Sequence, residues 1–451
     1  MAAFGKVLVA NRGAVAGRVL RALAAMNIPS VAVYSDADAG APYLAYASTT
    51  VHIGPAPARE SYLNQDALIA AMKEARADAV HPGYGFLSEN AAFATRVLAE
   101  GAQFIGPAPR WIADMGHKAR ARELAVRYGL PVGRGSGVLA HDRQAILGAG
   151  AAVGYPILVK PAGGGGGIGM LPAHTPDELL AAVDRAATLC ERAFGTADVY
   201  LERFVSRPRH VEFQVLGDRH GNVAHLFERD CSVQRRYQKM IEEAPAPAVQ
   251  RERIGAMAAR LADRLATAGY DNIGTVEMLM DADGELTFLE MNTRLQVEHG
   301  VTEAVTGVDL VAAQIRSAAG HRLSDILPRA IAINGHAIEA RVYAEDPKRF
   351  FPSPGTLRVF RPPSGSAIRI ETGYCEGRDV TPHYDPMLAK VIIHRPTREG
   401  ARTALIDALR EFAIEGVKSN IPALLAVLDS EEFKAGRPHT GLVGEVLARK
   451  A

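Results

Sequence analysis

The stretch from Thr275 to His299 constrains the fold of this chain more than any other feature. It contains two short apolar runs joined by the sequence Asp-Ala-Asp-Gly, which ends at Gly284. Because Asp-Gly tolerates the positive backbone angles of a tight turn, the stretch predicts a β-hairpin with Asp283 and Gly284 at the centre of the turn. In that register Glu277 lies directly opposite Glu290 on the partner strand.

The facing carboxylates predict a divalent metal site. Side chains alternate along a strand, so Asn292 projects from the same face as Glu290 and adds an amide oxygen to the carboxylates of Glu277 and Glu290. Like charges that face each other across two strands are destabilising unless they are compensated. Carboxylate and amide oxygens suit Mg²⁺ or Mn²⁺, which completes its shell with substrate phosphates and water.

The polar alternation continues beyond these metal ligands. Every second position is polar: Glu290, Asn292, Arg294, Gln296 and Glu298. A solvated edge strand would show the same period. Five different polar groups beside a metal pair indicate instead a site for an anion, with Arg294 as its cation and Glu298 as a base.

Composition narrows the class of protein. The 451 residues suffice for two or three domains. Hydrophobic residues make up 48% and charged residues 22%, with a formal net charge of +1, so we expect neither nucleic acid nor a membrane as partner. The three cysteines form no close pair, and no apolar run reaches membrane length. A soluble chain in a reducing cytoplasm fits this pattern.

Alternating patterns predict a parallel α/β unit in the N-terminal part. Strand patterns at residues 6–10, 31–34, 79–80 and 103–106 alternate with helical patterns. Such a βαβ series implies a parallel sheet. The glycines after the first strand lack the three-glycine spacing of a dinucleotide-binding fold. The loop His81–Asn90 follows a strand, where open sheets bind ligands, but the sequence leaves open whether it binds or only turns.

The run Gly163–Gly169 is the most glycine-rich stretch of the chain. A strand ending at Lys160 precedes it and apolar residues follow, so we expect a hairpin whose tip amides fold over phosphates. A P-loop would need lysine and serine or threonine directly after its glycines, and neither is present. A loop without fixed structure is the alternative. Further along, the charge-dense run Glu228–Lys239 is typical of a solvated face.

Together these motifs resemble the biotin carboxylase family, the ATP-grasp component of biotin-dependent carboxylases, over essentially the whole chain. The matching stretches are Ala10–Gly13, His81–Asn90, Met115–Lys118, Lys160 with its glycine loop, Arg229–Lys239, Glu242–Pro247, Glu290–Glu298 and His383–Met387. The resemblance implies an α/β architecture of three parts. These are a parallel α/β domain at 1–117, an ATP-grasp domain at 118–330 with a glycine-tipped lid at about 131–204, and a mixed α/β domain at 331–451.

The resemblance also implies a reaction. ATP would phosphorylate bicarbonate to carboxyphosphate, which decomposes to carbon dioxide and phosphate, and biotin on a separate carrier would then be carboxylated. The chain has no Ala-Met-Lys-Met segment to accept biotin, so we expect the biotin carboxyl carrier protein and the carboxyltransferase on separate chains. The resemblance favours a homodimer and an acyl-CoA carboxylase. The acceptor itself, whether acetyl-CoA, propionyl-CoA, another acyl-CoA, pyruvate or urea, is not encoded here.

Roles for single residues follow from the same resemblance. For ATP it implies Lys118, Lys160, Gly165, Gly166, Gly167, Glu202, His210, Gln234, Glu277 and Glu290. For Mg²⁺ or Mn²⁺ it implies Glu277, Glu290 and Asn292. For bicarbonate it implies Lys239, Arg294, Gln296, the backbone of Val297, and Glu298. The implied catalytic set is Glu298 as the base, Arg294, Lys239, and Arg341 as the group that stabilises phosphate and the biotin enolate.

Plainer interpretations and departures accompany these assignments. Lys118 could be an exposed helix lysine, His210 a packed strand residue and Arg341 an outward-facing one. The residue common in the family is replaced at four positions: Ile168 for arginine, Tyr237 for histidine, Arg203 for lysine and Gly300 for proline. We expect retained activity with altered nucleotide affinity. Two other functions stay open, namely another ATP-grasp ligase that joins a carboxylate to an amine, and a catalytically silent nucleotide-binding scaffold subunit.

Overall fold

The N-terminal unit of the protein is a parallel α/β sheet. The computed structural model describes residues 4–140, 142–163 and 169–450. Five parallel strands follow the order β3-β2-β1-β4-β5. Their bounds are β1 (Val7–Val9), β2 (Ser30–Tyr34), β3 (Thr49–His52), β4 (Ala79–His81) and β5 (Gln103–Phe104). The helices between them are α1 (Gly13–Ala25), α2 (Gln65–Glu74) and α3 (Ala91–Ala99). The predicted alternation of strands and helices is confirmed.

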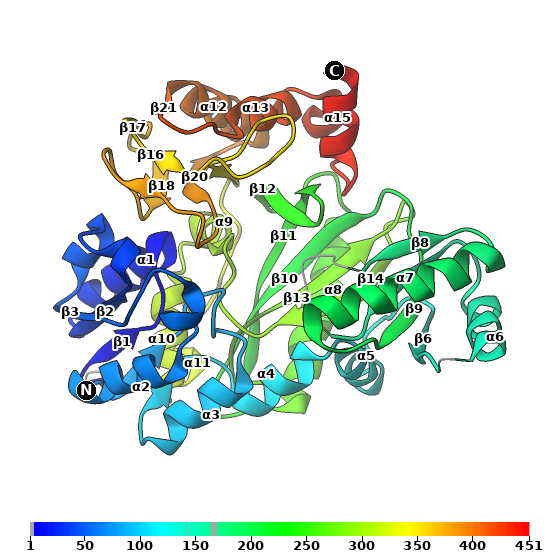
Figure 1. The fold of residues 1–451 in the computed structure, drawn as a ribbon, viewed down its shortest axis with the longest axis horizontal. Coiled ribbons are helices and arrows are strands. Elements are labelled where there is room, and N and C mark those ends of the chain that lie inside the picture. The colour runs from blue at the N-terminus through cyan, green and yellow to red at the C-terminus, as the bar shows by residue number, and fades with distance from the viewer. Residues whose placement is uncertain (1–3, 141, 164–168, 451) are drawn as a thin grey trace.

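A second, eight-stranded sheet forms the centre of the molecule (Figure 1), with the order β14-β13-β10-β11-β12-β15-β20-β18. Its strands are β10 (Arg209–Gly217), β11 (Val223–Arg235), β12 (Gln238–Ala244), β13 (Asn272–Met280), β14 (Leu286–Asn292), β15 (His336–Tyr343), β18 (Ile368–Thr372) and β20 (Met387–Arg395). Because β12 pairs directly with β15, the sheet continues across the boundary predicted near residue 331. The domain boundaries themselves stay predictions.

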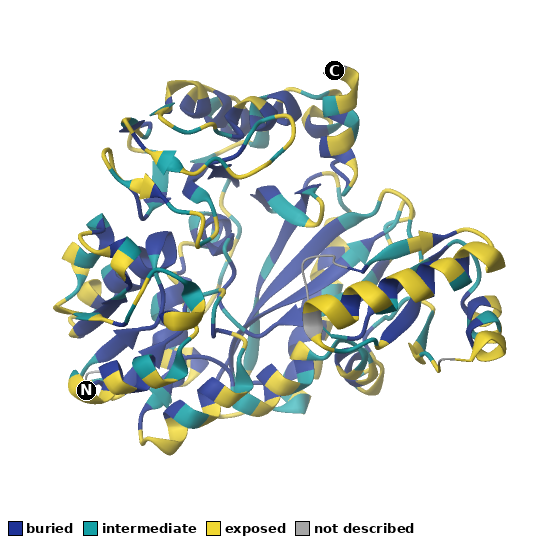
Figure 2. Ribbon diagram, viewed as in Figure 1, coloured by how far each residue is buried: buried dark blue, intermediate teal, exposed yellow. Residues whose placement is uncertain are grey.

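Helices from several parts of the chain contact this central sheet. Besides α1, they are α4 (Pro109–Gly116), α5 (Lys118–Arg127), α8 (Arg251–Ala268), α9 (His299–Thr306), α10 (Leu310–Ala318), α12 (Arg398–Glu411), α13 (Ile421–Leu428) and α15 (Leu442–Lys450). The remaining short elements are α11 (Leu323–Ile326), α14 (Glu431–Lys434), the 3₁₀ helices (Asp36–Asp38, Pro42–Tyr46 and Ala58–Glu60) and the strand pairs β16 (Gly355–Thr356) with β19 (Asp379–Val380) and β17 (Val359–Arg361) with β21 (Ala413–Glu415). The strands of the central sheet are consequently buried along most of their length (Figure 2).

The predicted lid is a separate four-stranded sheet with the order β6-β9-β7-β8. Its elements are β6 (Gly135–Val138), α6 (Arg143–Val153), β7 (Ile157–Pro161), β8 (Leu171–Ala173), α7 (Pro176–Phe194) and β9 (Val199–Arg203). The antiparallel pairing of β7 with β8 confirms strands on both sides of the glycine run. The tip of that hairpin, with Gly165, Gly166, Gly167 and Ile168, lies outside the described residues.

The hairpin of β13 and β14 pairs Glu277 with Glu290, as predicted, but its turn is longer than predicted and its pairing includes a β-bulge. The turn is a three-residue loop, because Asp281 Oδ1 accepts hydrogen bonds from the backbone nitrogens of Asp283 and Glu285, and Gly284 adopts a φ of 78°. Alone, this longer loop would shift the register by one residue. A β-bulge between Glu277 and Met278 adds one residue to β14 and restores the predicted pairing.

Two other predictions for this region are wrong. The strand ends at Asn292, and the chain is irregular from there until α9 begins at His299, although its polar side chains still converge. The run Glu228–Lys239 is not a solvated face. Its first half lies within β11 at the middle of the sheet, and Arg229 is fully buried, since buried carboxylates compensate its charge.

Candidate functional site

A cavity of about 290 Å³, here called the site cavity, lies over the β10–β14 region of the central sheet. Most of the predicted site residues line it: Lys118, Lys160, His210, Gln234, Lys239, Glu277, Glu290, Asn292, Arg294, Gln296, Val297, Glu298 and Arg341. They come from β7, α5, six strands of the central sheet (β10, β11, β12, β13, β14 and β15) and the irregular segment after β14. The structure therefore brings together residues that are more than two hundred positions apart in the sequence, such as Lys118 and Arg341.

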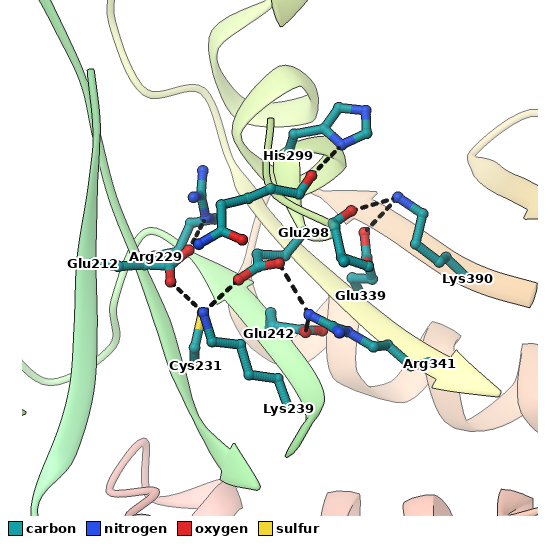
Figure 3. Close-up of polar contacts among 12 residues, drawn as sticks. Glu212, Arg229, Cys231, Lys239, Glu242, Glu298, His299, Glu339, Arg341 and Lys390 are labelled. Atoms are coloured by element: carbon teal, nitrogen blue, oxygen red, sulfur yellow. Dashed lines mark hydrogen bonds and ion pairs between the residues drawn. The ribbon is translucent and has the colours of Figure 1, made fainter. Parts of the chain in front are cut away.

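Lys239 is the centre of the site (Figure 3). Its Nζ lies 2.6 Å from Glu212 Oε2, 2.8 Å from Glu277 Oε1 and 2.7 Å from Glu298 Oε1. Figure 3 shows the contacts with Glu212 and Glu298. Burial by itself would lower the pKa of Lys239, but the three carboxylates raise it well above its ordinary value. The ammonium therefore stays charged and joins Glu277, the predicted metal ligand, to Glu298, the predicted base.

Glu277 is held ionised by its neighbours. Besides Lys239, its Oε1 accepts from Asn292 Nδ2 at 2.8 Å and Gln296 Nε2 at 3.0 Å, and His210 Nε2 lies 3.1 Å from Oε2. Burial raises the pKa of Glu277, but Lys239 and His210 outweigh it and lower the pKa to about 2. The carboxylate is thus available as a charged ligand at any physiological pH.

The chemistry of the donor set fits Mg²⁺ or Mn²⁺. Glu277 and Glu290 face each other in register, and Glu290 Oε2 is 3.3 Å from Lys118 Nζ. Asn292 turns its amide nitrogen toward Glu277, while its Oδ1 accepts from Arg294 Nη2 at 3.0 Å. The two carboxylates can ligate as they stand, whereas Asn292 would ligate after its amide turns over.

Arg294 is oriented by a residue that sequence reasoning missed. Its Nε donates to Glu89 Oε2 at 2.8 Å, and its Nη1 donates to Gln296 Oε1 at 2.7 Å. Glu89 belongs to the loop His81–Asn90, for which the sequence left a role open. The structure shows that this loop reaches the site through Glu89, and no local pattern distinguishes that glutamate from a solvated one.

Glu298 is fully buried between two cations. Its Oε1 faces Lys239, and its Oε2 accepts from Arg341 Nη2 at 2.9 Å. Burial and Glu212 act to raise the pKa of Glu298, but Lys239 and Arg341 outweigh them and lower it. Arg341 is itself buried, so its interpretation as an outward strand residue is wrong.

Glu212 and Arg229 form a supporting layer that the sequence analysis did not identify. Glu212 pairs in register with Glu277, so Glu212, Glu277 and Glu290 form a row of carboxylates across three strands. Arg229 Nε donates to Glu212 Oε1 at 2.6 Å and compensates one of these charges. The alternation from Arg209 onward places Glu212 on the face of His210, which is the signal that could have found it.

The lysines expected near ATP lie in the site. Lys160 is buried and its Nζ donates to Glu202 Oε2 at 2.8 Å, but Glu202 does not line the site cavity. The Lys118 side chain is 15% exposed, so the interpretation as an exposed helix lysine is wrong. His210 is buried at the cavity wall, and its Nδ1 is 2.9 Å from Gln234 Nε2.

The departures from the family pattern lie in different settings. Tyr237 is 54% exposed at the cavity rim, in the turn between β11 and β12. Arg203 ends β9 and donates to the carbonyl of Tyr155. A side chain at Gly300 would place its Cβ 2.5 Å from Ile392 Cδ1, so the packing of α9 requires a residue without Cβ there or a shift of Ile392.

A second cavity of about 350 Å³, here called the adjacent cavity, shares Arg294, Val297 and Arg341 with the site cavity. Its other walls include Tyr84 and Tyr384. The shared residues mean that a group in the adjacent cavity and an anion in the site cavity would meet at the same two guanidinium groups.

Three family profiles match successive parts of the chain. They describe the biotin carboxylase N-terminal domain at residues 3–112, the ATP-binding domain of the carbamoyl-phosphate synthase L chain at 117–326, and the biotin carboxylase C-terminal domain at 339–445.

Similar proteins extend over almost the whole chain. Biotin carboxylase 2 of Bacillus subtilis is 46% identical over 436 residues, which cover 96% of this chain and 97% of that protein. The mitochondrial methylcrotonoyl-CoA carboxylase subunit alpha of Oryza sativa subsp. japonica is 46% identical over 444 residues, which cover 97% of this chain and 60% of that protein. The crystal structure of the biotin carboxylase domain dimer of Hydrogenobacter thermophilus 2-oxoglutarate carboxylase, with MgADP, ADP and bicarbonate, has a TM-score of 0.94 and 41% identity, covering 98% of each chain.

Proposed function

Because this chain belongs to the biotin carboxylase family, whose members are ATP-grasp ligases of the first half-reaction of biotin-dependent carboxylases, we propose that the site cavity is where ATP phosphorylates bicarbonate. One observation carries this proposal. Lys239 contacts both Glu277, on the metal side, and Glu298, on the base side. A bicarbonate ion beside Lys239 would therefore lie between the γ-phosphate bound to the metal and the group that removes its proton.

The bicarbonate subsite is formed by Lys239, Arg294, Gln296, the backbone of Val297 and Glu298. An arginine fork matches a carboxylate-like anion and stays charged at physiological pH. In the structure described here Lys239 and Arg341 are paired with Glu298. An arriving anion would share both cations, and its negative charge would raise the pKa of Glu298, which makes that carboxylate a better base when its substrate is present.

The nucleotide subsite is formed by Lys118, Lys160, His210 and Gln234, with Glu202 at the adenine end. Phosphoryl transfer requires mainly positioning and neutralisation of negative charge, which the lysines supply. A divalent ion held by Glu277, Glu290 and Asn292 would neutralise further charge on the phosphates. The contacts expected from Gly165, Gly166 and Gly167 lie outside the described residues and stay predictions.

We place the biotin ring in the adjacent cavity, against Arg341 and Tyr84. The support is the shared wall, since carbon dioxide released in the site cavity would meet biotin without crossing solvent, and exclusion of water protects carboxyphosphate from hydrolysis. Arg341 would then stabilise both the departing phosphate and the enolate of biotin.

The partners are proposed to be a biotin carboxyl carrier protein and a carboxyltransferase on separate chains. A homodimer is supported by the dimer among the similar structures. No described helix combines the length and apolar character needed to cross a bilayer. Cys190 and Cys231 are buried free thiols, which supports a cytoplasmic location. An acyl-CoA acceptor is supported by the methylcrotonoyl-CoA carboxylase relative, and identification of the transferase that copurifies from native extract would test it.

The function is tested by measuring ADP release with and without bicarbonate and free biotin. We expect ATP hydrolysis that depends on bicarbonate, carboxylated biotin as a product, and a loss of at least about 100-fold in Glu298→Gln. Glu60→Gln, an exposed glutamate in the N-terminal unit, is the control and should retain full activity. ATP hydrolysis independent of bicarbonate would indicate another ATP-grasp ligase, and absence of hydrolysis would indicate a silent scaffold.

A further inference from the structure

Two glutamates behind Arg341 form a buried acid pair. Glu242 and Glu339 are register partners on the adjacent strands β12 and β15, and both side chains are fully buried. Neither lines the site cavity or the adjacent cavity. Figure 3 shows Glu242 beside Arg341 and Glu339 beside Lys390.

The pair lacks the partners that buried carboxylates usually have. Arg341 Nη2 lies 2.5 Å from Glu242 Oε1 as an ion pair without hydrogen-bond geometry, and the same nitrogen donates a hydrogen bond to Glu298 Oε2. Lys390 Nζ is 3.7 Å from Glu339 Oε2, beyond hydrogen-bond distance, and donates instead to the carbonyl of Val297. Among the described residues, none donates a well-directed hydrogen bond to any of the four oxygens of the pair.

Electrostatics disfavours two negative charges at this place. Around Glu242 the charged groups are Arg341, Glu298 and Lys239, and the titratable neutral groups are Cys231 and Tyr343. Around Glu339 they are Lys390, Arg341 and Glu371, together with Glu242 itself. Burial, with like charge added, raises the pKa of Glu242 to about 7 and that of Glu339 to about 8. The two carboxyl groups titrate as a pair, which holds at least one proton at neutral pH.

We propose that Glu242 and Glu339 share an exchangeable proton and, through Glu242, position Arg341 and set how much of its positive charge acts on the bound anion. The inference rests on the proposed function, because the anion is the bicarbonate of that site. While the pair holds its protons, Glu298 alone balances Arg341. When a proton leaves to solvent, a second carboxylate neutralises the guanidinium and adds a negative charge behind the bicarbonate subsite. Glu242 touches no substrate and is a positioning residue.

The kinetic test compares the KM for bicarbonate of the parent, Glu242→Gln and Glu339→Gln between about pH 6 and pH 9, with concentrations counted as the bicarbonate species. In the parent we expect the KM for bicarbonate to rise about tenfold across this pH range, because ionisation of the pair adds one negative charge next to a partly buried anion site. In Glu242→Gln it should stay flat and low. In Glu339→Gln the rise should remain near neutral pH, since the like charge that raises the pKa of Glu242 is that of Glu298, and Glu339 is still protonated where Glu242 ionises. The KM for ATP should not follow this pattern.

Glu243→Gln is the matched control, because Glu243 is the next residue on β12 and is also buried, but contacts His336 and Arg398 instead of Arg341. It should keep the slope of the parent. An unchanged slope in Glu242→Gln, or a flat profile in Glu243→Gln, would overturn the inference.

A spectroscopic test keeps the inference separate from the proposed function. Infrared spectra of the nucleotide-free protein should show the carbonyl stretch of a protonated carboxylic acid that disappears as the pH rises through neutrality. That band should be absent or displaced in Glu242→Gln and in Glu339→Gln, and unchanged in Glu243→Gln. A parent protein without such a band would refute the shared proton. If the band is present but ATP hydrolysis does not depend on bicarbonate, the proposed function fails, and the link to Arg341 fails with it.

Discussion

Arg294 Nε donates to Glu89 Oε2 at 2.8 Å, so a carboxylate of the N-terminal α/β unit orients a guanidinium of the irregular segment after β14 across 205 positions of sequence. The Glu89 Oε1 atom also accepts from the backbone nitrogen of Thr293 at 3.3 Å. Both contacts hold the irregular segment after β14 in place. The arrangement of the proposed bicarbonate subsite therefore depends on how the N-terminal α/β unit packs against the segment that follows β14.

Replacing Glu89 should impair bicarbonate binding more than ATP binding. In Glu89→Gln the charge-assisted bond to Arg294 is lost and the guanidinium is free to leave its orientation. We expect the KM for bicarbonate to rise about tenfold, the equivalent of about 1.4 kcal/mol, with little change in the KM for ATP. Steady-state ATP hydrolysis measures both, with Glu60→Gln as the control. Equal changes in both constants would argue against a specific role of Glu89.

Lys239 should be required for stability as well as for activity. Lys239→Gln leaves Glu212, Glu277 and Glu298 without their common cation. Removing one partner of a buried ion pair costs about 3–5 kcal/mol, so we expect a lower midpoint in urea unfolding together with loss of ATP hydrolysis. Lys348→Gln, an exposed lysine, should change neither. A Lys239→Gln protein with the same urea midpoint as the parent would show that the three carboxylates can take up protons without loss of folding stability.

The buried acid pair should make stability fall with rising pH. The pKa of Glu339 is raised in the folded protein to about 8 from an ordinary 4.5. Its contribution to stability is therefore complete below about pH 4.5 and is lost progressively as the pH rises through about 8.

Glu339→Gln lacks this titratable group. The difference between its midpoint of thermal unfolding and that of the parent should therefore change in favour of the variant from about pH 5 to about pH 8.5, by the equivalent of a few kcal/mol. Differential scanning calorimetry at the two pH values measures the gap. A gap that stays constant or shrinks with pH would mean that Glu339 is already ionised in the folded parent.

The metal subsite should depend on Glu290. In Glu290→Gln one of the two facing carboxylates is neutral, and we expect the Mg²⁺ concentration for half-maximal ATP hydrolysis to rise about tenfold or more. Glu285→Gln, an exposed glutamate of the same hairpin, is the control and should behave as the parent. Chelation of divalent ions should abolish hydrolysis in all three proteins. An unaltered Mg²⁺ requirement in Glu290→Gln would place the ion elsewhere.

Tyr237→His should preserve activity. Tyr237 is exposed at the rim of the site cavity, and exposed charges contribute about 1 kcal/mol or less, so the KM for ATP should change less than about fivefold. Because imidazole gains its charge only below about pH 6.5, any increase in the affinity for ATP should be larger at pH 6 than at pH 8. Titration of ATP at both pH values checks this expectation. A large loss of turnover would show that the hydroxyl of Tyr237 contributes to the reaction.

The sequence by itself determined the secondary-structure elements whose formation depends on residues that are close together in the chain. Strand and helix periodicity located β1, α1 and β7, and the Asp-Gly dipeptide located the hairpin of β13 and β14. The pairing of Glu277 with Glu290 was predicted correctly because two differences cancel, a longer loop held by Asp281 and a bulge in β14. The turn could be predicted from its own residues, but the β-bulge could not, because it depends on how β14 packs on the rest of the sheet.

Only the tertiary structure decided which distant strands became neighbours. The position of β10 beside β13 places Glu212 opposite Glu277, and the position of β12 beside β15 places Glu242 opposite Glu339. Packing of the loop His81–Asn90 against the segment after β14 places Glu89 against Arg294. No periodicity along the chain encodes these contacts, because strand order depends on how whole faces bury their apolar side chains. The types of residue that could act as ligands could therefore be read from local sequence. The charge states of these residues, and their pKa values, depend on the neighbours that the tertiary structure brings to them.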